Sequence, residues 1–161
     1  MSKKVLFLCT GNSARSQMAE AILNAKEGDR FIAYSAGTNP EKEINPLAVK
    51  VMDRAGIDIS NKRPKSYEIF ANEEFDFVIT LCNKGKEQCI SYIGRPIFAH
   101  WDFPDPADFK GTEIEKLRQF EEIFQQITTR VNLLCSIPID KLDRKAIELK
   151  TSEISNTSCN I

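Results

Sequence analysis

The residues best suited to chemistry stand together near the N-terminus, in the run Cys9-Thr-Gly-Asn-Ser-Ala-Arg15-Ser16. An apolar segment precedes this run, and a helical pattern begins near its end. Backbone N–H groups of a tight loop at a helix N-terminus bind anions, and a guanidinium can donate two parallel N–H bonds to an oxyanion. The residues expected to bind a tetrahedral oxyanion are Thr10, Gly11, Asn12, Ser13, Ala14 and Arg15.

Cys9 is the expected nucleophile of this loop. The positive environment of a helix N-terminus beside Arg15 favours a thiolate, and Ser16 is expected to hydrogen-bond to its sulfur. The alternative is an inert buried cysteine at the end of a strand. The combination of a cysteine, a glycine turn, an arginine and a helix start favours catalysis.

The elements that must position this loop alternate between strands and helices. Short apolar runs predict strands at 5–8, 31–35, 75–81 and 96–99. This alternation predicts an α/β fold, with a parallel sheet that has helices on both faces and binds ligands at the carboxyl ends of its strands. Cys9, Cys82 and the loop around Asp105 all follow such ends.

Four helices are expected between and after these strands. A helix that starts near Ser13 or Ala14 should bury Met18, Ile22 and Ala25. The second has an N-cap at Asn45, Pro46 in its first turn and a stop at Gly56, and should bury Ala48, Val51, Met52 and Ala55. A capping box of Thr112 and Glu115 opens a long helix that ends before Pro138. The last, at about 139–149, should bury Ile139, Leu142, Ala146 and Leu149.

Composition limits the remaining possibilities. A chain of 161 residues with 42% hydrophobic side chains fits one catalytic domain, placed at 1–150, with a polar and disordered tail at 151–161. The net charge of -1 argues against a nucleic-acid partner, and the first apolar run is too short for a signal peptide or a membrane span. We therefore expect a cytoplasmic protein, in which five cysteines do not form a structural disulfide framework.

The run from Cys9 to Glu20, together with Asp105-Pro106, resembles the anion loop and acid of low-molecular-weight protein tyrosine phosphatases and of the arsenate reductases built on that fold. The resemblance covers residues 1 to about 136. It implies a flavodoxin-like four-stranded parallel sheet in which Cys9 is the nucleophile, Arg15 binds the oxyanion and Asp105 is the acid. It leaves hydrolysis and reduction open.

Two features favour reduction. The segment from Thr80 to Cys89 is similar to the redox segment of thioredoxin-coupled arsenate reductases, and Ala107 stands where phosphatases of this fold usually carry an aromatic residue that stacks on phosphotyrosine. The resemblance thus implies a relay in which Cys9 attacks arsenate, Cys82 resolves Cys9, and Cys89 resolves Cys82. The catalytic set is then Cys9, Arg15, Ser16, Cys82, Cys89 and Asp105.

The expected protein is a monomer that binds arsenate or a similar oxyanion and has no tightly bound cofactor. An external thiol reductant, thioredoxin or glutathione with glutaredoxin, would regenerate it. One alternative is a low-molecular-weight phosphatase acting on phosphoesters, and residual phosphatase activity also fits a reductase. Another is a non-catalytic thiol redox sensor that uses Cys9 and Cys82.

We expect no metal site. Some reductases of this group bind potassium through a loop asparagine, a glutamate and a later carboxylate; Asn12, Ser35 and Glu20 are present here, but Lys65 lies near the place of that carboxylate. A zinc site is disfavoured because His100 is the only histidine. Cys135 is expected to be an inert core thiol, and no role is expected for Cys159.

Overall fold

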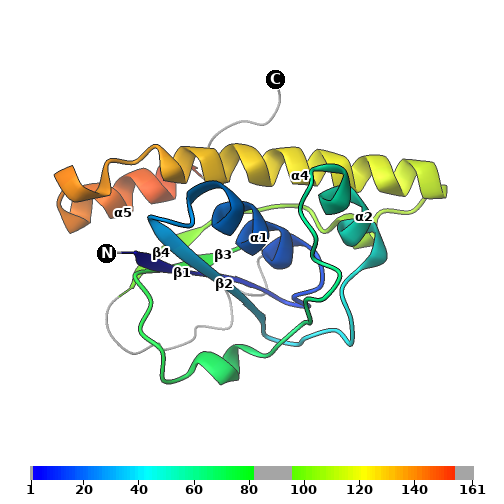
Figure 1. The fold of residues 1–161 in the computed structure, drawn as a ribbon, viewed down its shortest axis with the longest axis horizontal. Helices are drawn as coiled ribbons and strands as arrows, with labels where there is room; N and C mark the ends of the chain where they lie inside the picture. The colour runs from blue at the N-terminus through cyan, green and yellow to red at the C-terminus, as the bar shows by residue number, and fades with distance from the viewer. Residues whose placement is uncertain (1, 82–95, 155–161) are drawn as a thin grey trace.

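The computed structural model describes residues 2–81 and 96–154. Four parallel strands form one sheet in the order β2-β1-β3-β4, as Figure 1 shows. The strands are β1 (Lys3–Cys9), β2 (Phe31–Gly37), β3 (Phe77–Thr80) and β4 (Ile97–His100). This confirms the predicted parallel sheet and the approximate position of each strand.

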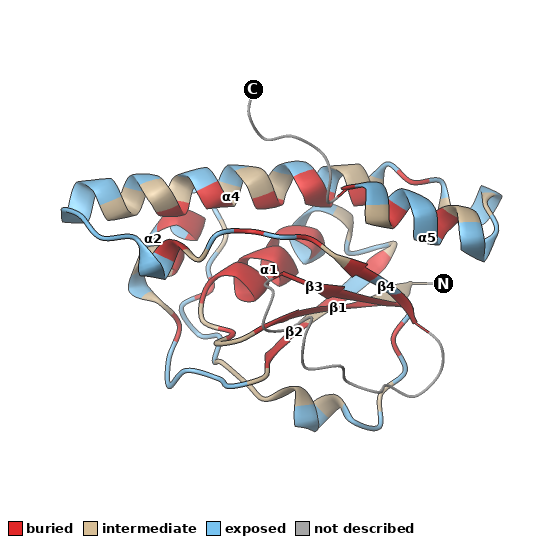
Figure 2. Ribbon diagram, turned by 180° about the vertical axis from the view of Figure 1, so that it is seen from behind, coloured by how far each residue is buried: buried red, intermediate tan, exposed pale blue. Residues whose placement is uncertain are grey.

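The α-helices of the described residues all pack on one face of the sheet (Figure 1). They are α1 (Arg15–Glu27), α2 (Pro46–Arg54), α4 (Glu113–Cys135) and α5 (Arg144–Glu153). Because side chains alternate along a strand, Val5 and Phe7 point into this helical layer while Leu6 and Leu8 point away from it. Figure 2 shows that most of the strand residues and the inward sides of the helices are buried.

The other face of the sheet packs against the segment that carries the 3-10 helix η1 (Tyr67–Phe70). Tyr34, Phe70 and Phe75 meet there edge to face, with ring centroids 5.5 to 5.7 Å apart. Within the described residues, the segment that carries η1 covers this face of the sheet.

Helices α2 and α4 begin as predicted. The Asn45 side chain accepts the N–H of Leu47, and Gly56 ends the α2 turn with a φ of 80°. Thr112 and Glu115 form a complete capping box at α4. Helix α1 begins at Arg15, slightly later than predicted. Its N-cap residue is Ala14, and unlike α2 and α4 it has no side-chain cap.

The inward faces were predicted correctly in the middle of the helices and wrongly near some ends. Ala25 and Ala55 are exposed, and so is Leu149 in α5, where Ile147 is buried instead. The phase of α5 differs because Asp143 caps it by accepting the N–H of Ala146 and starts the helix at residue 144.

The last helix also runs further than predicted. It reaches Glu153, with Thr151 and Ile154 buried, so the polar tail cannot begin at 151. Thr151 is tolerated in the core because its hydroxyl donates to the Ile147 carbonyl and its own carbonyl accepts the indole N–H of Trp101. Over residues 2–81 and 96–154, no helix combines the length and apolar character needed to cross a membrane.

Candidate active site

Cys9 lies at the carboxyl end of β1, in the middle of the sheet, and only 2% of its surface is exposed. Its sulfur is 2.9 Å from the hydroxyl oxygen of Ser16 and accepts the backbone N–H of Asn12 at 3.3 Å. Two polar groups thus lie at hydrogen-bonding distance from the sulfur. Hydrogen bonds to the charged form of a thiol favour the thiolate, so this site suits a nucleophile.

The loop after Cys9 turns its carbonyls away from the sulfur. The Gly11 carbonyl accepts the N–H of Glu41, and the Ser13 carbonyl accepts the N–H of Asn45, both at 2.9 Å. In a planar trans peptide the carbonyl and the following N–H point in opposite directions. The next N–H groups, at positions 12 and 14, therefore point inward, which makes the loop a set of donors for an anion.

Gly37, at the end of β2, allows this arrangement through its lack of a side chain. A Cβ at this position would lie 2.5 Å from the Thr10 carbonyl oxygen. The neighbouring N–H of Thr38 donates to the Cys9 carbonyl at 3.0 Å. Strand β2 thus packs directly against the loop that follows Cys9.

Asn12 holds the loop in an unusual conformation. It is fully buried and has a φ of 52°, the left-handed region that few residues other than glycine adopt. Its side-chain N–H donates to Ser16 at 2.7 Å, while its oxygen accepts from the Gln17 side chain and the Lys65 backbone at 3.0 and 2.9 Å. The Asn12 side chain is therefore part of the hydrogen-bond network behind the sulfur of Cys9. Gln17 and Lys65 were not predicted as supports because the sequence gives no sign of this contact.

Arg15 and Asp105 meet at the open side of the loop. One terminal nitrogen of Arg15 is 3.3 Å from a carboxylate oxygen of Asp105, and the other donates to the Phe103 carbonyl at 3.0 Å. A guanidinium has five N–H donors, so these contacts leave donors for an oxyanion. The predicted acid and the predicted oxyanion ligand thus come together from the ends of β1 and β4.

Arg130, on α4, supports the acid loop and was missed by the sequence reasoning. Its guanidinium lies over the Phe103 ring, 4.3 Å from the centroid, and donates to the Asp102 carbonyl at 2.8 Å. An arginine on a helix is commonly a surface residue, so its type gave no signal; here only 7% of its surface is exposed.

A cavity of about 570 Å³ opens in front of Cys9. It is lined by the whole predicted oxyanion loop and by the loop of Asp105. Among the described residues that line it, the acidic ones are Glu41, Asp102, Asp105 and Asp108, and Arg15 is the cation. Phe103 is its aromatic residue and is 2% exposed, so the cavity offers little ring surface to an aryl group.

The other cysteines divide into two groups. Cys82, Cys89 and Cys159 lie outside the described residues, so the relay remains a prediction. Cys135 ends α4 and is half-buried, and burial raises the pKa of its thiol. A raised pKa keeps the thiol protonated at neutral pH, as expected for an unreactive cysteine.

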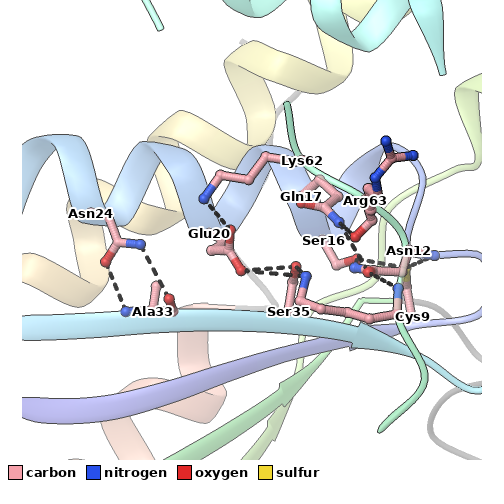
Figure 3. Close-up of polar contacts among 11 residues, drawn as sticks. Cys9, Asn12, Ser16, Gln17, Glu20, Asn24, Ala33, Ser35, Lys62 and Arg63 are labelled. Atoms are coloured by element: carbon pink, nitrogen blue, oxygen red, sulfur yellow. Dashed lines mark hydrogen bonds and ion pairs between the residues drawn. The ribbon is translucent and has the colours of Figure 1, made fainter. Parts of the chain in front are cut away.

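Glu20 and Ser35 lie behind the loop, as Figure 3 shows. The Ser35 hydroxyl donates to Glu20 at 3.1 Å, Lys62 lies 3.4 Å from the same carboxylate, and the Lys65 ammonium donates to Ser35 at 3.3 Å. The ammonium groups of Lys62 and Lys65 both lie within 4 Å of the Glu20 carboxylate and supply the positive charge there, so these residues do not fit a potassium ion. Within the described residues no group of three or more histidine, cysteine or acidic side chains forms a metal site.

Comparison with known proteins assigns the family. The model of the low molecular weight phosphotyrosine protein phosphatases matches residues 4–148. The chain belongs to this family. A curated arsenate reductase from Bacillus licheniformis is 42% identical over 132 residues, which are 81% of this chain and 94% of that protein.

Solved structures of the family include both kinds of enzyme. An arsenate reductase in the phosphate binding state has a TM-score of 0.65 at 30% identity and covers 81% of this chain and 94% of its own. A low molecular weight protein tyrosine phosphatase from T. tengcongensis has a TM-score of 0.70 at 28% identity, and the match covers 88% of this chain and 100% of that one. A thioredoxin-dependent arsenate reductase from Corynebacterium glutamicum has a TM-score of 0.56 at 27% identity, and the match covers 82% of this chain and 62% of that one. These likenesses confirm the predicted flavodoxin-like phosphatase fold.

Proposed function

We propose that the protein is an arsenate reductase, in which Cys9 attacks arsenate held by residues 10–15 and two further cysteines complete the reduction. The observation that carries this proposal is the sulfur of Cys9, held by Ser16 and the Asn12 N–H at the base of a cavity that Arg15 and Asp105 also line. The relatives named arsenate reductase support the choice of substrate.

In the first step the Cys9 thiolate attacks arsenic, and one arsenate oxygen leaves as water after taking a proton from Asp105. The N–H groups of the loop and the free donors of Arg15 bind the remaining oxygens. Asp105 contacts Arg15, which places its carboxyl group at the mouth of the loop. General acid catalysis of this kind needs the carboxyl group within hydrogen-bond reach of the leaving oxygen.

In the second step the Cys82 thiolate attacks the sulfur of Cys9. A disulfide forms, the sulfur–arsenic bond breaks, and its electron pair stays on arsenic, so As(V) becomes As(III) and leaves as arsenite. Cys89 then attacks Cys82, which frees the Cys9 thiolate and leaves a disulfide between Cys82 and Cys89. The relay rests on the similarity of the segment 80–89 to that of thioredoxin-coupled reductases.

An external thiol reductant must reduce this last disulfide. Thioredoxin is the first candidate because one structural relative is a thioredoxin-dependent arsenate reductase, and glutathione with glutaredoxin is the second. Both systems keep thiols reduced in the cytoplasm, which is therefore the compartment we propose. We further propose that the protein acts as a monomer without a tightly bound cofactor.

The second candidate function is phosphotyrosine or phosphoester hydrolysis, favoured by the family and by the phosphatase structure with a TM-score of 0.70. The cavity argues against an aryl substrate. Ala107 supplies no ring at the mouth, Phe103 is buried, and the acidic residues around Arg15 repel phosphorylated segments rich in acidic side chains.

The testing experiment is arsenate-dependent oxidation of NADPH with thioredoxin and thioredoxin reductase, repeated with glutathione, glutaredoxin and glutathione reductase. We expect turnover with at least one system, its loss in Cys82→Ser and Cys89→Ser, and its retention in Cys135→Ser, the matched control. Turnover that survives Cys82→Ser would refute the relay. Hydrolysis of an aryl phosphate without arsenate turnover would establish the phosphatase instead.

A further inference from the structure

A buried acidic group lies directly behind the nucleophile loop. Glu20, on α1, is 5% exposed and accepts the hydroxyl of the fully buried Ser35 on β2. A carboxylate at this depth needs a positive partner, because an unpaired buried charge is strongly destabilising. Figure 3 shows Glu20 between Ser35 and Lys62.

Lys65 contacts both this acidic group and the nucleophile loop. Its ammonium donates to Ser35 at 3.3 Å and is 3.9 Å from Glu20, while its backbone N–H donates to the side-chain oxygen of Asn12 at 2.9 Å. Asn12 in turn bonds to Ser16, which contacts Cys9. A single residue therefore joins the buried carboxylate to the support of the sulfur.

The electrostatics of Lys65 also link its ammonium group to Glu20 and to Cys9. Burial lowers the pKa of Lys65 below the usual lysine value and Lys62 lowers it further, while Glu20 and Cys9 oppose this shift. The attraction between Lys65 and Cys9 is mutual, so the ammonium also favours the charged form of the sulfur. The Lys62 ammonium also pairs with Glu20, at 3.4 Å, from a more exposed position.

We propose that Lys65 is a positioning residue that acts as a built-in monovalent cation, so that the nucleophile loop is completed without an alkali-metal ion. This inference rests on the proposed role of Cys9 as the nucleophile. The ammonium supplies the positive charge beside Glu20 and Ser35, and the backbone of the same residue fixes Asn12. The Lys65 side chain therefore supplies the positive charge that a bound ion would otherwise supply.

The test measures the reactivity of Cys9 itself, so it does not depend on arsenate turnover. Purified full-length protein is alkylated with iodoacetamide at pH 7 in potassium, sodium or choline chloride of equal ionic strength, and the Cys9 peptide is followed by mass spectrometry. The wild-type rate should be the same in all three salts. A rate that rises with potassium over choline would overturn the proposal.

Variants at position 65 separate the ammonium from the backbone. Lys65→Met keeps the backbone N–H and most of the stem but removes the charge, and we expect alkylation of Cys9 to slow by at least about threefold. Lys65→Arg should restore most of the rate, which a purely structural role of the stem would not require. An unchanged rate in Lys65→Met would contradict the proposal.

Two further variants complete the test, one as a control for the loss of a lysine and one that reverses the charge at position 65. Lys4→Met breaks a Lys–Glu pair at the opposite end of β1 and should leave Cys9 reactivity unchanged. Lys65→Asp adds a carboxylate beside Glu20, and its Cys9 should become more reactive in potassium than in choline chloride. If Lys65→Met fails to fold, the salt comparison on wild-type protein and the Lys65→Arg variant still decide the question. Loss of arsenate turnover with this pattern intact would refute the proposed reaction and leave the role of Lys65 standing.

Discussion

Helices α1 and α4 begin in opposite ways. At the start of α4 the N–H groups of Thr112 and Glu115 are each satisfied by the other residue's side chain, which makes a complete capping box. Helix α1 begins at Arg15 after Ala14, whose side chain has no oxygen to offer, and no side-chain cap is present. Uncapped N–H groups at a helix start need another partner, and here the cavity of Cys9 lies beside them.

The difference shows how one structural problem has two solutions. At α4 the cap contributes stability and no chemistry. At α1 no side chain caps the helix, and the loop is held by backbone N–H groups of other segments, which donate to its carbonyls and to the side-chain oxygen of Asn12. In the proposed function a bound oxyanion acts as the cap of α1, so we expect ligand binding and helix stability to be coupled there and independent at α4.

The largest effect is expected from removing Cys9, the proposed nucleophile at the end of β1. Cys9→Ser should lower arsenate turnover by at least about 10⁴-fold, because a serine hydroxyl is a far weaker nucleophile than a thiolate. The variant should still bind phosphate, since the loop donors remain. Turnover and phosphate binding by calorimetry check both statements, and substantial turnover would show that another residue attacks arsenate.

Arg15→Lys should have the next largest effect. It keeps the charge but loses the two parallel N–H bonds to the oxyanion, and we expect a decrease of about 10³-fold in kcat/KM. The matched control is Arg54→Lys on α2, an exposed arginine that pairs with Glu121 far from the cavity and should leave kcat/KM unchanged. Equal decreases in both variants would point to a general loss of structure.

Asp105→Asn should lower the rate of the first step by about 10²-fold, because the amide cannot give a proton to the leaving oxygen. Single-turnover kinetics of arsenate consumption measure this step. If the rate is unchanged, Asp102 or Asp108 is the acid and the assignment is wrong.

The smallest expected effects are changes in stability, and they compare the starts of α1 and α4 directly. Phosphate at 100 times its Kd should stabilise the folded protein by about 2.7 kcal/mol. Thr112→Ala at α4 should lower the free energy of unfolding by about 1 kcal/mol and leave turnover and the phosphate effect unchanged. Chemical denaturation with and without phosphate measures both, and a reduced phosphate effect in Thr112→Ala would show that the helix starts are coupled.

The parts of the fold that local chemistry determines could be predicted from the sequence. The caps at Asn45 and Thr112 and the stop at Gly56 depend on a few neighbouring residues, and each is present in the structure. The exposure of Ala25 and the burial of Thr151 depend on contacts between distant segments. The indole N–H of Trp101, for example, donates to the Thr151 carbonyl from the loop after β4.

The candidate site follows the same division. Parallel strands place their carboxyl ends together, which made the meeting of Arg15 and Asp105 predictable in outline. The supports of the site come from elements whose relative position the sequence does not reveal: Arg130 reaches the acid loop from α4, and Lys65 reaches Asn12 from the segment after α2. The relay cysteines Cys82 and Cys89 remain predictions.

A single turnover without any external reductant tests the central claim most directly. Fully reduced protein is mixed with excess arsenate, and arsenite and remaining thiols are counted. The account predicts one arsenite formed and two thiols lost per chain in the wild type, and neither change in Cys9→Ser. Arsenite formed by Cys9→Ser, or thiols that remain intact while arsenite appears, would contradict it.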